Sequence, residues 1–212
     1  MTVPRLCLVA APLGLFTYGI LRWIGRLAQP YGPGPAWQVA HTAALIGIVL
    51  FVPAVIGLRR LLPAGPQREI TVLGTLLGLA ATAVQFAVDI GAATGAADHA
   101  AMVARTAAFA SVPGVRLAVY QVGPALGYAG LVALAVLLVL AGRLRWWSVA
   151  LVLAGVVLPV VNLDLIAVGA VCLLTGFGPL IEPELTDHSG LVEGDAGHAA
   201  CVAGPGRGQM EP

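Results

Sequence analysis

Charge is scarce in this chain. Only 10% of its 212 residues are charged, whereas about a quarter of the residues in a soluble domain are. Hydrophobic residues make up 59% of the chain, and the mean hydropathy is +0.94. This composition excludes a soluble globular domain and is that of an integral membrane protein.

Lysine is absent, and all 11 basic residues are arginine. With so much alanine, glycine and proline, this indicates the codon usage of a high-GC bacterium and not a functional surface. The acidic residues leave a formal net charge of only +1, so nothing favours a nucleic acid or a polyanionic partner. We expect the lipid bilayer to be the main partner, with another membrane protein as a candidate.

Cysteine is scarce, and Cys7, Cys172 and Cys201 are far apart, without a C-x-x-C spacing. A disulfide framework is therefore not expected. The patterns H-E-x-x-H, G-x-S-x-G and the P-loop are also missing. His41 is the only histidine in an apolar segment, which argues against a bis-histidine haem and a histidine-rich metal site. We expect no cofactor and no metal, and no catalytic residue is assigned.

Four apolar segments reach the length of about 20 residues that a helix needs to cross a membrane. They cover about 6–25, 37–58, 70–93 and 117–141. Segments rich in Pro, Gly or arginine separate them, as in QPYGPGPAW, RRLLPAGPQRE and GRLRWW. The first apolar run lacks a small-residue cleavage site, so we interpret it as an uncleaved first span.

The fifth apolar region, 147–181, is too long for one upright helix and holds a proline, Asn162 and Asp164 near its centre. These residues are costly in the middle of a membrane helix. Two short helices, about 147–160 and 164–181, avoid most of that cost. We therefore predict an all-α, polytopic transmembrane helical bundle of six spans, with five as the alternative, whose last two spans form a hairpin.

Arginine placement predicts the orientation, because positively charged short loops tend to stay in the cytoplasm. Six arginines fall at one end of the predicted bundle and four at the other. We expect a bacterial inner (plasma) membrane protein whose N-terminus and C-terminal tail are cytoplasmic.

Two segments fall outside the predicted spans. In 97–114, apolar residues recur near helical spacing, which predicts a short helix on the outer surface. Residues 182–212 are acidic, rich in Gly and without hydrophobic period, as in a disordered tail. The predicted organisation is a transmembrane domain at 1–181 followed by this tail.

Several polar residues lie at matching depths, roughly 6 Å inside the outer ends of their spans. Gln85 lies one turn deeper than Asp89 on the same face, and the turn in 147–181 brings two more polar side chains to this layer. Because an unpaired charge in hydrocarbon is costly, we predict a polar cluster in which His41 or Arg22 offsets Asp89. The candidate ligand-binding or proton-handling residues are His41, Gln85, Asp89, Tyr120, Gln121, Asn162 and Asp164.

A structural interpretation stays open for the same residues, since side chains near the interface can reach headgroups and water. Asn162 and Asp164 are suited to capping a helical turn. Tyr18, Trp37 and Tyr120 are suited to anchoring in an aromatic belt. Pairs of glycines four residues apart predict close packing inside the bundle; they are Gly74 and Gly78, Gly91 and Gly95, and Gly123 and Gly127.

The segment WQVAHTAALIGIVLFVPAVIGLRRLL, where a histidine opens a span that ends in arginines, precedes Gly-rich spans and a closing double hairpin. This layout resembles small multi-pass membrane proteins of high-GC bacteria classed as domains of unknown function. The resemblance covers about 1–181 and implies no activity.

Three function classes remain open from the sequence. We favour a non-enzymatic membrane protein that binds a membrane partner or a small ligand at the outer polar cluster. The alternatives are a small transporter or permease-like subunit, and a membrane-embedded enzyme using His41 and Asp89 as acid and base.

Overall fold

The computed structural model describes residues 3–28 and 32–181, so the predicted tail at 182–212 lies outside the described residues. The described part contains seven α-helices and no strand, which confirms the all-α prediction. A π-helix, η1, precedes the fifth helix, and two short 3₁₀ helices, η2 and η3, flank the seventh. The bounds are α1 Val3–Ala28, α2 Pro35–Arg59, α3 Pro66–Ala93, α4 His99–Ala110, η1 Arg116–Val122, α5 Gly123–Leu140, α6 Trp146–Val161, η2 Leu163–Leu165, α7 Ile166–Phe177 and η3 Gly178–Leu180.

Five helical stretches are long and apolar enough to cross a membrane. They correspond to α1, α2, α3, η1 with α5, and η2 to η3 with α7 between them. The remaining apolar helix, α6, has only 16 residues. The helices α6 and α7 are separated at Asn162 and pack against each other, so the predicted hairpin is confirmed.

Two helices begin inside segments that we interpreted as loops. α2 starts at Pro35 and α3 at Pro66, each directly after a glycine. Proline suits the first turn of a helix, because its missing N–H has no intrahelical partner there and its φ is already helical. These prolines therefore start the two helices instead of only separating them.

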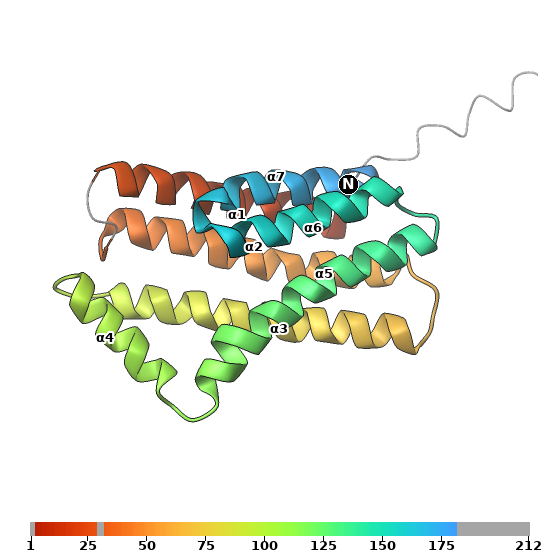
Figure 1. Cartoon of the computed structure of the whole chain (residues 1–212). Helices are drawn as coiled ribbons and strands as arrows, with labels where there is room; N and C mark the ends of the chain where they lie inside the picture. Colours follow the sequence, from red (N-terminus) through yellow and green to blue (C-terminus); the bar gives the residue numbers. More distant parts are fainter. Residues whose placement is uncertain (1–2, 29–31, 182–212) are drawn as a thin grey trace, which may run out of the picture. The chain divides into compact units, whose positions relative to one another are not determined.

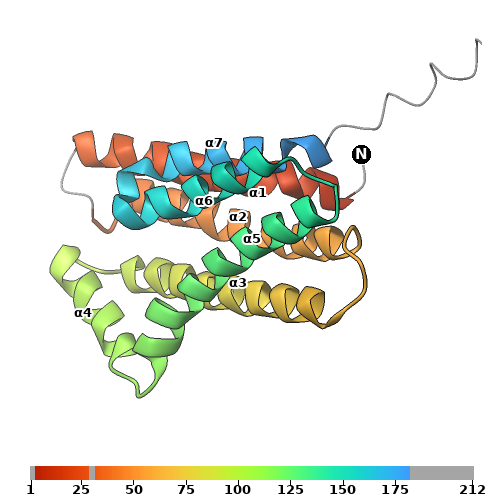
Figure 2. The same ribbon diagram turned by 45° about the vertical axis from the view of Figure 1, so that its right-hand side comes forward.

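The five membrane-length stretches and the shorter α6 form a ring. Each packs against the next one along the chain, and α7 closes the ring against α1. Successive helices run antiparallel, and α4 packs on α3 at one end of the ring (Figures 1 and 2). We call this end the α4 end, and the opposite end, where the loops containing Arg60 and Arg143 lie, the arginine-loop end.

Three pairs of helices pack backbone against backbone where a glycine of one helix meets a glycine of the other. A Cβ atom on Gly14 of α1 would lie 2.7 Å from the Gly47 Cα on α2. A Cβ on Gly155 of α6 would lie 2.9 Å from the Gly169 carbonyl oxygen on α7. Membrane helices associate through such close approaches, because lipid offers no hydrophobic driving force between them.

The third pair, α3 and α5, contains two of the predicted glycine pairs. A Cβ on Gly78 would collide with the Gly127 backbone and lie 2.7 Å from the Gly123 carbonyl oxygen. The packing predicted for these three glycines is confirmed. Gly91 and Gly95 have open space where a Cβ would stand, so for this pair the prediction is wrong. They lie near the end of α3, which its neighbours approach less closely.

Candidate functional site

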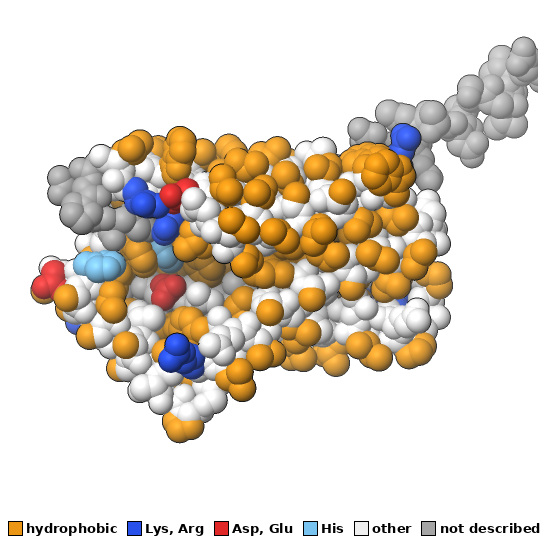
Figure 3. All heavy atoms as spheres, viewed as in Figure 1, with side chains coloured by type: hydrophobic (Ala, Val, Ile, Leu, Met, Phe, Trp, Pro, Cys, Tyr) orange, Lys and Arg blue, Asp and Glu red, His pale blue; other side chains and the backbone are white. Residues whose placement is uncertain are grey.

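A hollow lies at the α4 end, and charged and histidine side chains gather around it on the face shown in Figure 3. The middle of that face is covered by hydrophobic side chains, as a bilayer-facing surface requires. In Figure 1 the turn between α6 and α7 does not extend as far toward the α4 end as the C-terminal end of α1 does. We define the Asp89 cluster as Tyr18 of α1, His41 of α2, Phe86 and Asp89 of α3, and Tyr120 of η1.

His41 is enclosed by aromatic rings and is only 3% exposed. Its ring stacks on Trp37, one turn earlier on α2, with centroids 3.9 Å apart. The ring centroids of Tyr18 and Phe86 lie 5.2 and 5.6 Å away. Nδ1 lies 2.9 Å from the Trp37 carbonyl oxygen. Because a carbonyl oxygen only accepts, Nδ1 carries a hydrogen, and Nε2 is the nitrogen whose protonation can change.

Tyr18 lies inside the bundle and is 4% exposed. Its ring meets Phe86 edge-on, with centroids 5.5 Å apart, and its hydroxyl lies beside Arg22. The interpretation of Tyr18 as an aromatic-belt anchor is therefore wrong. Ala11, two turns earlier, is also buried, so Tyr18 belongs to the side of α1 that packs on other helices.

Asp89 is half-buried near the C-terminal end of α3. Its charge is close enough to act on the phenols of Tyr18 and Tyr120. Within the described residues its carboxylate makes no hydrogen bond and no ion pair. Gln85, one turn earlier, is also half-buried and has no hydrogen-bond partner in that part of the chain.

Arg22, one of the two residues predicted to offset Asp89, pairs with a different carboxylate. Arg22 Nε lies 3.4 Å from Asp164 Oδ1, and Arg26 Nη1 lies 2.6 Å from the same oxygen. Arg22 and Arg26 are one turn apart on α1, so both reach η2 where it packs on that helix. The structure therefore differs from the expected pairing, and Asp164 belongs to the contact between α1 and α7.

Asn162 caps the turn between α6 and α7. Its side-chain oxygen accepts the backbone N–H of Asp164 at 2.9 Å, which is the capping role open to it from the sequence. Asn162 and Gln121 are both exposed. Of the seven candidates, His41 packs against Tyr18 and Phe86, Asp89 lies near Tyr120, and Asn162 and Asp164 lie at the hairpin turn.

Tyr120 is positioned by a π-helix. The N–H of Gly123 bonds to the carbonyl of Ala118, five residues back, and Pro124 has no N–H to continue an α-helical pattern. The Tyr120 ring meets Phe109 of α4 with centroids 6.4 Å apart. Its hydroxyl is buried and has no hydrogen-bond partner among the described residues.

The predicted short helix in 97–114 is present as α4, and Arg105 fixes it to the end of α3. The guanidinium donates to the carbonyl oxygens of Thr94 at 2.7 Å and Gly95 at 3.2 Å, satisfying carbonyls that the helix end leaves open. Met102 of α4 is buried against Ala92 and Ala93. One border of the hollow is thus held in place by specific contacts.

A cavity of about 80 Å³ lies below the cluster, lined by residues from α1, α2, α3, α5, α6 and α7. Phe86 borders both spaces, since it lines this cavity and contacts Tyr18 and His41. Thr82 and Tyr128 are the only lining residues with polar side chains, and the Thr82 hydroxyl donates to the Gly78 carbonyl at 2.9 Å. The cavity is therefore an apolar space within the ring.

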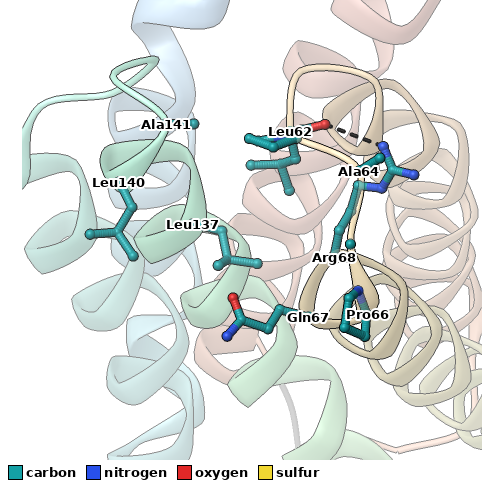
Figure 4. Close-up of a pocket in the computed structure, with 10 residues that line it drawn as sticks. Leu62, Ala64, Pro66, Gln67, Arg68, Leu137, Leu140 and Ala141 are labelled. Carbon is teal, nitrogen blue, oxygen red and sulfur yellow. Dashed lines mark hydrogen bonds between the residues drawn. The ribbon is translucent and has the colours of Figure 1, made fainter.

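A second depression, of about 380 Å³, lies at the arginine-loop end between the α2–α3 loop and the end of α5. Figure 4 shows Arg68 turned toward the Leu62 carbonyl, to which it donates at 3.3 Å. Arg68 also pairs with Glu69, with 2.7 Å between nitrogen and oxygen. Its charge is already satisfied, so this depression is a weaker candidate than the Asp89 cluster.

Two residues of the α4 end were missed from the sequence. Phe86 gave no signal, because one more aromatic residue in an apolar helix is ordinary. From the sequence, Arg26 is only one of the four arginines at one end of the predicted bundle. Its spacing of four residues from Arg22, itself four residues after Tyr18, was the signal that all three occupy one side of α1.

Comparison with protein-family models, with curated proteins and with solved structures finds no match to this chain. The resemblance in layout to small bacterial membrane proteins is therefore supported only at the level of a multi-helix protein with five membrane-length apolar helices. On its helix lengths and hydropathy, the chain is an integral, multi-pass membrane protein.

Proposed function

We propose that the chain is a non-enzymatic membrane protein that binds a small organic cation at the Asp89 cluster. One observation carries this proposal: the half-buried Asp89 carboxylate has no hydrogen-bond or ion-pair partner in the described part of the chain. An unpaired charged side chain costs about 3 kcal/mol at the centre of a membrane span, and Asp89, nearer the end of α3, bears part of that cost. A bound cation supplies the missing partner. Because positively charged short loops tend to stay in the cytoplasm, we expect the cluster to open to the outside of the cell.

The aromatic surroundings favour an organic cation over a metal ion. Tyr18 and Phe86 pack edge-on against each other, with Phe86 one turn before Asp89 on α3, and Tyr120 adds a ring whose buried hydroxyl can accept a hydrogen bond. Aromatic faces attract ammonium and guanidinium groups within about 6 Å. No group of three His, Cys, Asp or Glu side chains gathers anywhere in the described residues. A substituted ammonium or guanidinium compound fits these groups best.

Calorimetric titration of the detergent-solubilised protein with benzyltrimethylammonium and with phenylguanidinium tests the proposal. Asp89→Asn removes the charge and keeps the shape of the side chain. We expect it to weaken binding at least about tenfold, while the protein still accumulates in the membrane and unfolds at the wild-type temperature.

Asp98→Asn is the matched control. Asp98 lies at the same end, where its side chain accepts the Ala101 N–H at 2.8 Å, and asparagine caps a helix equally well. We expect no change in cation binding in this variant. Binding that survives Asp89→Asn, or equal losses in both variants, contradicts the proposal.

Transport of the same cation is a second candidate, favoured by the cavity beneath Phe86. That cavity is lined by all six ring helices, and transporters bind their substrates near mid-depth between helices. In proteoliposomes, uptake of benzyltrimethylammonium that disappears in Asp89→Asn and rises in Phe86→Ala assigns transport. Binding without uptake supports the first proposal.

A further inference from the structure

A groove runs along the outside of the ring between α1 and α7. Two depressions adjoin there, of about 410 and 320 Å³, and share Trp23 and Asp164. The larger is lined mainly by apolar side chains, including Phe16 and Ile20 of α1 and Val168 of α7. The smaller lies at the charged end of the groove. Together they form one continuous surface, which we call the α1–α7 groove.

The floor of the α1–α7 groove is closed by a backbone contact. A Cβ on Gly19 would lie 2.7 Å from the Ala167 backbone nitrogen, so the two helices touch at this level. Phe16 and Ile20, four residues apart, stand on one side of the contact at 37% and 38% exposed, and Val168 stands on the other at 50%. These exposed apolar side chains face the bilayer and match an acyl chain.

The charged end of the groove holds two arginines and one carboxylate among the described residues. Arg22 and Arg26 share the single carboxylate of Asp164. The Arg26 side chain is 49% exposed, so part of its guanidinium faces outward. Arginine forms paired hydrogen bonds to phosphate oxygens, and the exposed Trp23 suits the level of lipid headgroups.

We propose that the α1–α7 groove binds one anionic phospholipid. Its phosphate lies at Arg26 and Arg22, and one acyl chain lies along Phe16, Ile20 and Val168. This site is separate from the Asp89 cluster and does not depend on the cation proposed there. A bound lipid of this kind holds α1 and α7 together where the ring closes.

Native mass spectrometry of the purified protein with phosphatidylglycerol, phosphatidylcholine or free glycerol phosphate tests the site. We expect one phosphatidylglycerol to bind more tightly than phosphatidylcholine, and glycerol phosphate not to bind. Arg26→Gln should weaken phosphatidylglycerol binding about tenfold. Arg116→Gln, at an exposed arginine of the same end, should leave it unchanged.

A second variant tests the chain-binding part without touching the charges. Val168→Phe fills the groove and should also weaken phosphatidylglycerol binding about tenfold. The same change at Val157, a residue of α6 that is 44% exposed, should not. Equal binding of the two lipids, loss of binding in Arg116→Gln as large as in Arg26→Gln, or full binding in Val168→Phe overturns the proposal.

Discussion

At the scale of single residues, His41 and Asp89 differ in whether their polar atoms have hydrogen-bond or ion-pair partners. His41 is buried, stacks on Trp37 and donates from Nδ1 to a backbone carbonyl. Its contacts are those of a core residue. Asp89 is half-buried and has no hydrogen-bond or ion-pair partner within the described residues. We therefore expect the binding of a charged ligand to depend on Asp89 more than on His41.

The first prediction separates packing from chemistry at His41. His41→Ala leaves a void between three aromatic rings and should lower the free energy of unfolding by about 3 kcal/mol. His41→Phe keeps a ring of similar size and should cost less than about 1.5 kcal/mol. Thermal unfolding in detergent measures both, and calorimetry with benzyltrimethylammonium should show that His41→Phe still binds. Loss of binding in a stable His41→Phe protein assigns the imidazole a direct role.

Depth was the residue-level property that the sequence could predict. Counting residues from span ends predicts one layer for His41, Asp89 and Tyr120, and their joint role as a site stays a prediction. Pairing was not predictable, because depth does not tell which side of a helix faces which neighbour. Asp164 has the right depth, but it faces α1 and binds Arg22 and Arg26. Partner choice depends on how the helices are ordered around the ring.

At the scale of helices, the pair α3 and α5 supports the site. Both Asp89 and Phe86 lie on α3, and Tyr120 lies on the π-helix that leads into α5. The close approach at Gly78 and Gly127 fixes the spacing of these two elements. The glycine spacing predicted this contact, whereas the π-helix, which re-aims Tyr120, left no separate signal beyond Pro124.

A glycine-to-alanine comparison on α3 tests this packing. Gly78→Ala places a Cβ against the α5 backbone and should destabilise the protein by about 1–3 kcal/mol. Gly91→Ala is the matched control on the same helix, because its Cβ meets open space. It should be neutral or stabilise by up to about 1 kcal/mol, since alanine is the better helix former. Equal unfolding temperatures for the two variants are incompatible with a tight α3–α5 contact.

At the scale of the whole described unit, closure of the ring links the last helix to the first. The contact between α1 and α7 contains the Gly19–Ala167 approach and the ion pairs of Asp164. Composition and helix length were sufficient to predict a multi-pass bundle. Closure was not, because it depends on the short α6 turning back at Asn162 and on which helix α7 then meets.

Closure between antiparallel α1 and α7 requires an even number of crossings, and this can be measured in cells. Compartment-sensitive reporters after Gly190 and within 60–65 should report the same side, and a reporter within 111–114 the opposite side. The placement of the arginines predicts that the shared side is the cytoplasm. A reporter after Gly190 that agrees with 111–114 instead means an odd number of crossings. In that case α7 cannot run antiparallel to α1, and neither the ring nor the α1–α7 groove survives.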